Sequence, residues 1–459
     1  MKPSFSLNAI LIAAGAILLT GCGDAETTIN ELPPIVVEMP VNPGTGGGGN
    51  NDFLIKSDGR LAVSALDSNQ VSVFDLDDNR ILDDFSMVHK GNRVEASADY
   101  RFAVIINRDN DYVGFIDGAL WREDHVEHLH DYEKAPEISN FALFGSSPTH
   151  VDSYKGLMAI FNDGDADAGI PSSVTVLSDM DIASGNDDVA TLMFNVSMHG
   201  VAKPRGEYLI ASVRRDDAES TSTNTRLPDQ VGVFHLHNDE YEQEQLFDVL
   251  CPNLHGAAQN DEFVAFGCSD GVLVVHEHGD DFEATKLINI DALGSARIGS
   301  LYGHERSENM FGIASNRATG ESFLLAVNPK EMEMKQVDWQ PVDGAAAIGF
   351  AFSYDAEHFV ILDNQGFVTV LDAHEHDGHM HWDFRERVDV AEADIADLPD
   401  GATFTMTMSQ NHGYVYVSDP IAQHILKLNL ESLAVSEEIE LAYVPASITW
   451  LGIAKAHDH

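Results

Sequence analysis

Short apolar runs recur along this chain, and each of them ends at Gly, Asn or Asp. Hydrophobic positions with the 3.6-residue period of a helix are almost absent between Asp52 and His457. The runs recur at spacings of roughly forty to fifty-five residues and span 60–67, 101–109, 157–165, 208–216, 263–271, 311–316, 359–366 and 414–419. This pattern predicts an all-β chain that is built from repeats.

A second strand follows most of these runs, and a third, less regular strand follows in several repeats. The second strands are clearest at 70–77, 172–179, 230–237, 271–278 and 367–374. Strand-only repeats of this length, separated by turn residues, are typical of the blades of a β-propeller, and the eight copies favour eight blades over seven. The segment 445–457 is a strand pair left over at the end. We expect it to pair with the N-terminal strands and close the ring, which removes the exposed sheet edge. A parallel β-helix, the weaker alternative, would need shorter rungs.

The N-terminus has the pattern of an exported bacterial lipoprotein. Lys2 is followed by an apolar stretch, 9–19, that has the length of a signal peptide rather than of a membrane span. It leads into Leu-Thr-Gly-Cys at 19–22, which matches the lipobox, so residues 1–21 are predicted to be removed and Cys22 to carry the lipid. An ordinary cleaved signal with a chance cysteine is the alternative. Gly23, in place of an aspartate, favours the outer membrane by the usual sorting rule, so we expect a lipid-anchored periplasmic protein.

The segment after the predicted lipid is rich first in proline and then in glycine, and such a composition cannot bury a core. We therefore interpret residues 22–52 as the lipidated cysteine and its tether. Residues 53–459 remain for the folded part, which is more than one simple core usually holds. A single propeller domain accounts for this length.

The charge of the chain limits its partners. There are 75 acidic against 26 basic residues, which gives a formal charge of −49. Such a chain repels nucleic acid and anionic lipid headgroups, so we expect no nucleic-acid partner and membrane contact through the lipid anchor only. Solubility in a salty habitat and attraction of cations both remain compatible with this charge. We expect a monomer.

Two cysteines besides Cys22, Cys251 and Cys268, bracket one predicted β-hairpin. In an oxidising compartment such a pair is expected to form a disulfide. A pair of thiolate metal ligands is the alternative.

Histidines occur at one phase of the repeat. Seven to nine residues before the apolar run, His150, His199 and His255 occupy three successive repeats, separated by 49 and 56 residues. Glu95 precedes Phe102 of its own run by the same seven residues by which His150 precedes Leu157. Because the innermost strands of a propeller run along its axis, equivalent side chains of neighbouring blades converge on the central channel. Three imidazoles with a carboxylate or water suit tetrahedral Zn²⁺. Hydrogen bonding across a polar channel is the alternative.

Two further histidine tracts are expected in loops between strands. The first contains His125, His128 and His130, and the second contains His374, His376, His379 and His381. Tracts of alternating imidazoles and carboxylates indicate sites that collect metal ions with low affinity. The alternative is that both tracts are solvated polar loops.

Several segments resemble the AztD family of periplasmic zinc metallochaperones. They are HLHDYEKAP (128–136), PTHV (148–151), MHGVA (198–202), CPNLHGAA (251–258) and VAFGCSDGVLV (264–274). The resemblance covers most of the chain after the tether, and it implies a β-propeller that passes zinc to the solute-binding protein of a zinc ABC importer. It also implies a Cys251–Cys268 disulfide and zinc held by histidines of these motifs. The members of that family are soluble, so this chain differs from them in carrying a lipobox.

Three functions are compatible with the sequence. The first is a zinc-binding chaperone or reservoir that is not an enzyme. The second is a zinc-dependent propeller hydrolase of the lactonase kind, in which an open zinc position would activate water and Glu95 would act as the base. No nucleophile motif or pair of catalytic acids supports that reading. The third is a surface interaction protein whose histidines are incidental.

Overall fold

The computed structural model describes residues 30–31, 56–124, 129–217, 227–391 and 393–455. The predicted signal peptide, Cys22 and nearly all of the tether lie outside the described residues, as do His125 and His128. No helix in the described ranges is long and apolar enough to cross a membrane.

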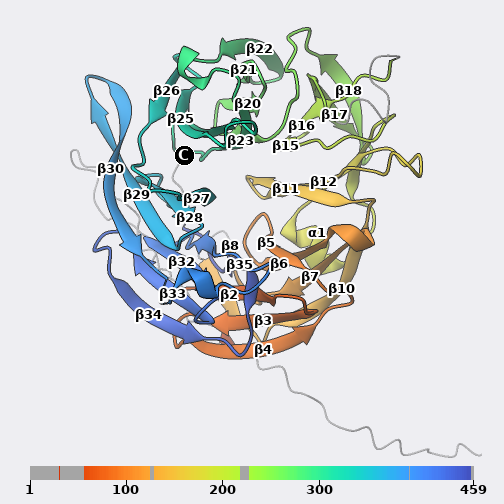
Figure 1. The fold of residues 1–459 in the computed structure, drawn as a ribbon. Coiled ribbons are helices and arrows are strands. Elements are labelled where there is room, and N and C mark those ends of the chain that lie inside the picture. Colours follow the sequence, from red (N-terminus) through yellow and green to blue (C-terminus); the bar gives the residue numbers. More distant parts are fainter. Residues whose placement is uncertain (1–29, 32–55, 125–128, 218–226, 392, 456–459) are drawn as a thin grey trace, which may run out of the picture.

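The described chain is a ring of antiparallel sheets around a central axis (Figure 1). Its strands, in chain order, are β2 (Arg60–Ala65), β3 (Gln70–Asp75), β4 (Arg80–Ser86), β5 (Arg93–Ala96), β6 (Phe102–Asn107), β7 (Tyr112–Asp117), β10 (Glu137–Phe144), β11 (Pro148–Tyr154), β12 (Leu157–Asn162), β13 (Ser173–Leu177), β14 (Ala190–Met193), β15 (Ala202–Arg205), β16 (Tyr208–Val213), β17 (Gln230–His237), β18 (Glu240–Leu246), β19 (Ala257–Gln259), β20 (Phe263–Gly267), β21 (Gly271–His278), β22 (Asp281–Ile288), β23 (Arg297–Tyr302), β24 (Met310–Ser315), β25 (Ser322–Asn328), β26 (Glu333–Val337), β27 (Ala347–Phe352), β28 (His358–Asp363), β29 (Phe367–His376), β30 (His379–Asp389), β31 (Thr405–Met408), β32 (Tyr414–Asp419), β33 (His424–Asn429), β34 (Val435–Glu440) and β35 (Pro445–Leu451).

The predicted all-β propeller is confirmed. Within the described ranges, six four-stranded sheets and one eight-stranded sheet form the ring. The eight-stranded sheet joins the group β11 to β14 to the group β15 to β18 through the single parallel pair Thr191–Glu240. Counting each four-stranded group as one blade would give the eight that the sequence favours, and the count itself stays a prediction.

The ring closes through its first and last strands, as the sequence predicts. Strand β35 pairs with β2, from Arg60 opposite Leu451 to Ala65 opposite Pro445, so residues from both ends of the domain share one sheet. Trp450 of β35 is almost fully buried, and its indole nitrogen donates to the carbonyl of Asp58 at 2.9 Å. Strand β2 is therefore paired on both sides, with β35 and with β3, and has no open edge.

The hydrophobic core lies between neighbouring sheets. The second strands, such as β2 and β6, are buried along their whole length, because both of their faces pack against adjacent sheets. The first strand of each group, here called an inner strand, faces the axis, and β11 is accordingly only half-buried over most of its length. Polar side chains on the inner strands are therefore presented to a central channel.

A small three-stranded sheet is separate from the sheets of the ring. It contains β8 (Leu120–Asp124), β9 (Leu129–Glu133) and β1 (Asn30–Glu31), and β1 lies within the segment expected to be a tether. Arg60, which is buried, holds this sheet through an ion pair of 3.0 Å to Glu133 and a hydrogen bond of 2.8 Å to the carbonyl of Lys134. The remaining elements are the helix α1 (Asp179–Ser184) and the 3₁₀ turns η1 (Arg108–Asn110), η2 (Asp291–Leu293) and η3 (Ile395–Asp397).

Candidate metal centre

Three histidines from successive four-stranded groups meet at one end of the central channel. His150 lies near the start of β11, and His199 and His255 lie in the segments just before β15 and β19. The Nε2 atoms of His150 and His199 are 3.3 Å apart, and those of His199 and His255 are 3.0 Å apart. The structure therefore brings together the three histidines that the repeat phase singles out.

A glycine after two of these histidines permits the close approach. Gly256 has φ of +65°, and a Cβ there would lie 2.7 Å from the carbonyl oxygen of Gly299 on the next sheet. A Cβ on Gly200 would lie 2.4 Å from the ring of Phe161. The His-Gly pairs of the sequence thus reflect backbone that packs too closely for any side chain.

The other ring nitrogens of two histidines are fixed by acceptors. His255 Nδ1 donates to the carbonyl of Gly299 at 2.6 Å, and His199 Nδ1 donates to a carboxylate oxygen of Asp163 at 2.8 Å. Because a carbonyl oxygen can only accept, the proton of neutral His255 lies on Nδ1, and the carboxylate places the proton of His199 in the same way. Both Nε2 atoms then carry lone pairs.

Two lone pairs that face each other across 3.0 Å repel each other unless a cation lies between them. A metal ion satisfies this requirement, and histidine ligands held by a second acceptor are the usual arrangement in metal sites. In a tetrahedral zinc site, Zn–N bonds of about 2.0–2.1 Å place the nitrogens about 3.3–3.4 Å apart. The measured separations of 3.0 and 3.3 Å are close to this value.

The three rings contact one another rather than surrounding a common point. The rings of His150 and His255 meet edge to face with centroids 6.0 Å apart. Within the described ranges, no group of three or more His, Cys, Asp or Glu side chains is set in the arrangement of a complete metal site. Small ring rotations that open the cluster would therefore accompany metal binding.

The environment of the cluster favours the neutral form of two of its imidazoles, those of His150 and His255. The pKa of His150 is lowered to about 3, chiefly by burial and then by the neighbouring His199 and His255, against the opposing effect of Asp163. Burial also lowers the pKa of His255. Neutral imidazole is the form that binds metal, so these histidines are ready to act as ligands at neutral pH.

Glu95 does not lie level with the imidazoles. It pairs with the third residue of β6, whereas His150 pairs with the fifth residue of β12, and Arg93 is the residue at the corresponding height. The turn at 97–101 is longer than the turn at 155–156, so equal spacing in sequence gives different heights in the channel. The carboxylate of Glu95 lies 3.6 Å from Arg93, and its role as a ligand stays a prediction.

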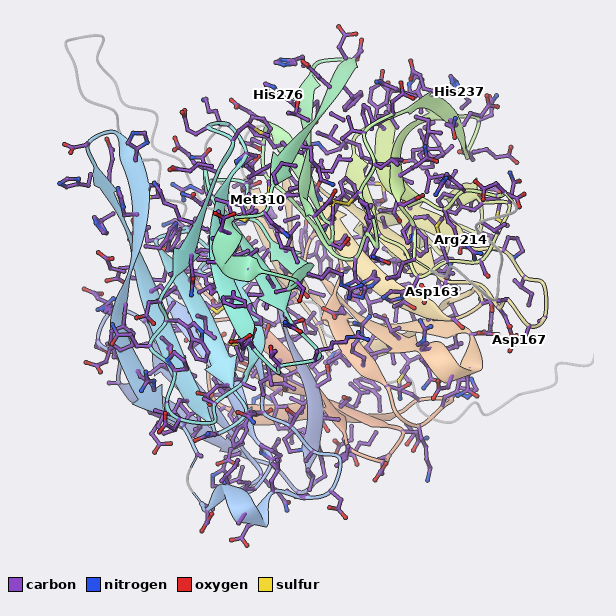
Figure 2. The ribbon with its side chains drawn as sticks, turned by 45° about the horizontal axis from the view of Figure 1, so that its top comes forward. Asp163, Asp167, Arg214, His237, His276 and Met310 are labelled. Atoms are coloured by element: carbon purple, nitrogen blue, oxygen red, sulfur yellow. A yellow bond between two sulfur atoms is a disulfide. The ribbon has the colours of Figure 1, made fainter. Side chains whose placement is uncertain are left out.

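Asp163 is the functional residue that the repeat pattern does not reveal. It directly follows β12, where the apolar runs of this chain commonly end at Asp or Asn, and only the structure shows that it supports His199. Figure 2 shows Asp163 toward the middle of the ring and Asp167 farther out at the rim. A recess of about 190 Å³ reaches His199 here, lined also by Arg108, Ser197 and Met198.

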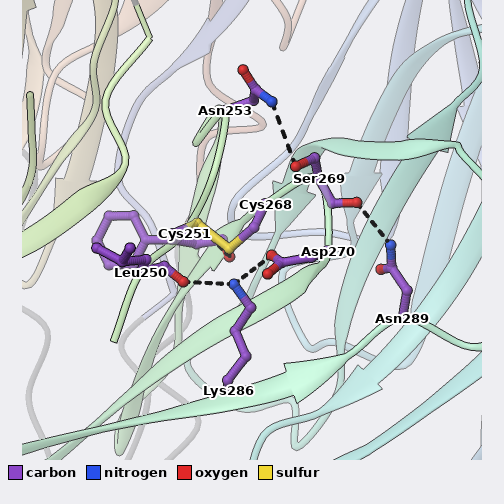
Figure 3. Close-up of a disulfide and its surroundings, with 9 residues drawn as sticks. Leu250, Cys251, Asn253, Cys268, Ser269, Asp270, Lys286 and Asn289 are labelled. Atoms are coloured by element: carbon purple, nitrogen blue, oxygen red, sulfur yellow. Dashed lines mark hydrogen bonds and ion pairs between the residues drawn. A yellow bond between two sulfur atoms is a disulfide. The ribbon is translucent and has the colours of Figure 1, made fainter. Parts of the chain in front are cut away.

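The disulfide constrains the segment that carries His255. Cys251 and Cys268 are bonded, with Cα atoms 5.0 Å apart (Figure 3). Beside them, Lys286 donates to the carbonyl of Leu250 at 2.8 Å and pairs with Asp270. The link ties the segment before β19 to the β20–β21 turn, which limits the positions that His255 can take.

The second histidine tract is a paired β-hairpin, not a loop. In the register of β29 and β30, His374 is opposite His381 and His376 is opposite His379. Directly opposed residues share a face, and so do residues two apart, so all four imidazoles lie on one side of this arm, here called the histidine hairpin. The rings of His374 and His381 stack with centroids 5.7 Å apart, and His374 Nε2 is 3.5 Å from a carboxylate oxygen of Asp383.

His130 of the first tract also lies in a strand. It belongs to β9, opposite Glu123 of β8, and its ring stacks on Tyr132 with centroids 6.0 Å apart. The bidentate pair between Arg122 and Asp131 joins β8 to β9, so His130 lies in a paired strand where a loop was expected.

The fold and the site together define a β-propeller with a cluster of three imidazoles at one end of its channel. Comparison with known proteins gives a particular likeness, since the chain is 25% identical over 417 residues to the Zinc chaperone AztD of Citrobacter koseri, covering 87% of this chain and 89% of that protein. The resemblance noted in the sequence is thereby confirmed. No family model matches the chain.

Solved structures agree with this likeness in fold. The apo structure of AztD from Citrobacter koseri and a second crystal structure of it match with TM-scores of 0.68 and 0.70, each at 20% identity over 87% of this chain and 99% of theirs. Dihydro-heme d1 dehydrogenase NirN, in complex with DHE, matches with a TM-score of 0.52 at 9% identity, over 86% of this chain and 76% of that one. NirN shares the fold, while the curated relative is named a chaperone and not an enzyme.

Proposed function

We propose that this chain is a zinc-binding metallochaperone of the periplasm, which holds Zn²⁺ at His150, His199 and His255 and passes it to the solute-binding protein of a zinc ABC importer. The observation that carries the proposal is the 3.0 Å contact between two Nε2 lone pairs whose other ring nitrogens are fixed by acceptors. The likeness to the Zinc chaperone AztD supports the same cargo and role.

The geometry suits a carrier that must release its ion. Three imidazoles leave one position of a tetrahedral ion for another donor, and the recess beside His199 gives that donor a route. A side chain of an acceptor protein entering there would replace the histidines one after another. The histidine hairpin, with imidazoles on an exposed arm, is the weaker accessory site in this proposal.

The anchoring belongs to the same proposal. Lipid on Cys22 would hold the protein at the periplasmic face of the outer membrane, and the linker would let the propeller reach its acceptor. The pairing of Asn30–Glu31 with β9 shortens the linker available for this reach.

The test begins with metal content. The protein, purified anaerobically without a histidine tag, should carry at least one tightly bound zinc in elemental analysis, and the triple variant H150A/H199A/H255A should carry none at the tight site. The matched control H89A/H237A/H278A removes three histidines outside the cluster and should keep it. If the two variants have equal zinc content and equal affinity, the channel histidines are not the zinc site. If the wild type holds no zinc, the proposed function is ruled out.

A further inference from the structure

Arginines stand close to each of the three channel histidines, in a chain with only 26 basic against 75 acidic residues. Arg93 donates to the carbonyl of Thr149, next to His150, at 2.5 Å. Arg108 pairs at 2.8 Å with the same oxygen of Asp163 that accepts from His199. Both arginine side chains remain nearly half exposed, at 45% and 47%.

Two further arginines lie on the side of His255. Arg297 begins β23, and its Nη2 atom is 3.7 Å from the position of a Cβ on Gly299, whose carbonyl accepts from His255. Strand β24 ends at Ser315, which lies opposite Arg297, and the exposed Arg317 follows two residues later. Burial is the main cause of the lowered pKa of His255, and the charges of both arginines also lower it. We call Arg93, Arg108, Arg297 and Arg317 the arginine collar.

Among the described residues, the pair formed by Arg297 and Arg317 lacks an acidic partner. In the part of the chain that is described, no ion pair or hydrogen bond joins either guanidinium to a carboxylate, although Arg101 and Arg122 are each paired with an aspartate. Burial lowers the pKa of Arg297, and the like charge of Arg317 lowers it further. Two neighbouring cations without a counterion destabilise each other, and this is unusual in a chain where carboxylates are nearly three times as frequent as basic groups.

Attraction of zinc does not explain the collar. Positive charges beside a cation site oppose binding of Zn²⁺ from solution, so the collar weakens the function of a simple zinc reservoir. A surface that carries carboxylates would gain from it, because guanidinium groups pair with carboxylates through two parallel hydrogen bonds. The rest of this acidic chain would repel the same surface and leave the collar as its point of attachment.

We propose that the arginine collar is the docking surface for a partner protein that presents carboxylates around its own zinc ligands. The inference rests on the proposed function, since this partner is the protein that receives the zinc. Docking would place the partner's ligands over the recess beside His199. The partner's carboxylates would also neutralise the collar while the ion crosses.

The experiment measures zinc transfer from the loaded full-length protein to the purified zinc solute-binding protein of the same bacterium. R297Q/R317Q removes the unpaired pair, and the control R80Q/K330Q removes two exposed charges elsewhere, on β4 and after β25. We expect the collar variant to transfer zinc about 3–10-fold more slowly at low salt, with a weaker dependence on salt between about 20 and about 500 mM NaCl. The control should behave like the wild type.

Release of zinc to a small chelator, measured in parallel, separates docking from affinity. Loss of two cations beside the site should tighten zinc binding, so the slowing of protein-to-protein transfer must exceed any slowing of release to the chelator. If wild type transfers zinc and R297Q/R317Q matches it at every salt concentration, the docking proposal alone fails. If the wild type transfers none, the delivery function fails and the docking proposal fails with it.

Discussion

The substitution Asp163→Asn tests whether the channel histidines act as metal ligands that are held by a second group. Asp163 is buried, with its side chain 7% exposed, and it accepts from His199 Nδ1 at 2.8 Å. The variant replaces a hydrogen bond to a carboxylate by one to a neutral amide, so the ring loses both orientation and electron density at Nε2. Partners of this kind typically contribute 10–100-fold to metal affinity, which corresponds to about 1.4–2.8 kcal/mol.

The assay is competition for zinc with a chelator of known affinity. Asp167→Asn is the matched control, because it removes the same charge from the same loop, and Asp167 is exposed at the rim. It should change affinity less than about twofold, in keeping with a solvated charge. The double variant D163N/R108Q then removes the arginine that Asp163→Asn leaves without its ion-pair partner. Recovery of affinity in the double variant would assign the loss to that charge.

The reasoning would be refuted if Asp163→Asn bound zinc as tightly as the wild type. It would also be refuted if Asp163→Asn and Asp167→Asn weakened binding equally, since the net charge of the loop would then explain the loss. Circular dichroism and thermal unfolding of each variant should be recorded first, so that a folding defect is not taken for a lost ligand.

Four further outcomes are expected. Cys22→Ser should abolish incorporation of labelled palmitate, and unchanged labelling would exclude the lipid anchor. Mass spectrometry of non-reduced peptides should find Cys251 and Cys268 linked, and replacing both by alanine should lower stability by about 3 kcal/mol, since the loop they close is short. Because the pKa values of His150 and His255 are lowered, tight zinc affinity should fall by less from pH 7 to 5.5 than the roughly several hundredfold that three unperturbed imidazoles would lose; a calorimetric pH series decides this. Deleting the histidine hairpin should lower zinc capacity in a titration and leave the tight site intact, and loss of the tight site would reverse the two roles.

The fold could be predicted because its signals are local. Each second strand is buried on both faces, so it appears in the sequence as an apolar run that ends at a turn residue, and the order of the runs gives the ring. The histidine hairpin carried a local signal as well, since Asp377 and Gly378, both with positive φ, form the two-residue turn typical of hairpins. Its high content of charged and histidine residues made a loop the more natural expectation.

The candidate site could be predicted only in part, because its completion depends on contacts between sheets. The repeat spacing brought out His150, His199 and His255. The acceptors that fix two of them are a carboxylate at the end of β12 and a backbone carbonyl of β23, and no pattern along the chain links these groups to the rings. Glu95 was matched to His150 by counting residues, a method that fails when two turns differ in length.

Because β2 pairs with β35, the ring of sheets can close only after β35 has been synthesised. The two strands lie almost the whole length of the domain apart, so β2 is made early and its inner neighbour is the last strand to be made. At synthesis rates of about 5–20 residues per second, the interval between them is on the order of 20–80 s. During that time the first sheet has an open edge and Trp450 has not yet been made. The ring therefore closes in a late step, and a chain that is cut short before residue 445 would leave the edge of β2 exposed to pairing with other chains.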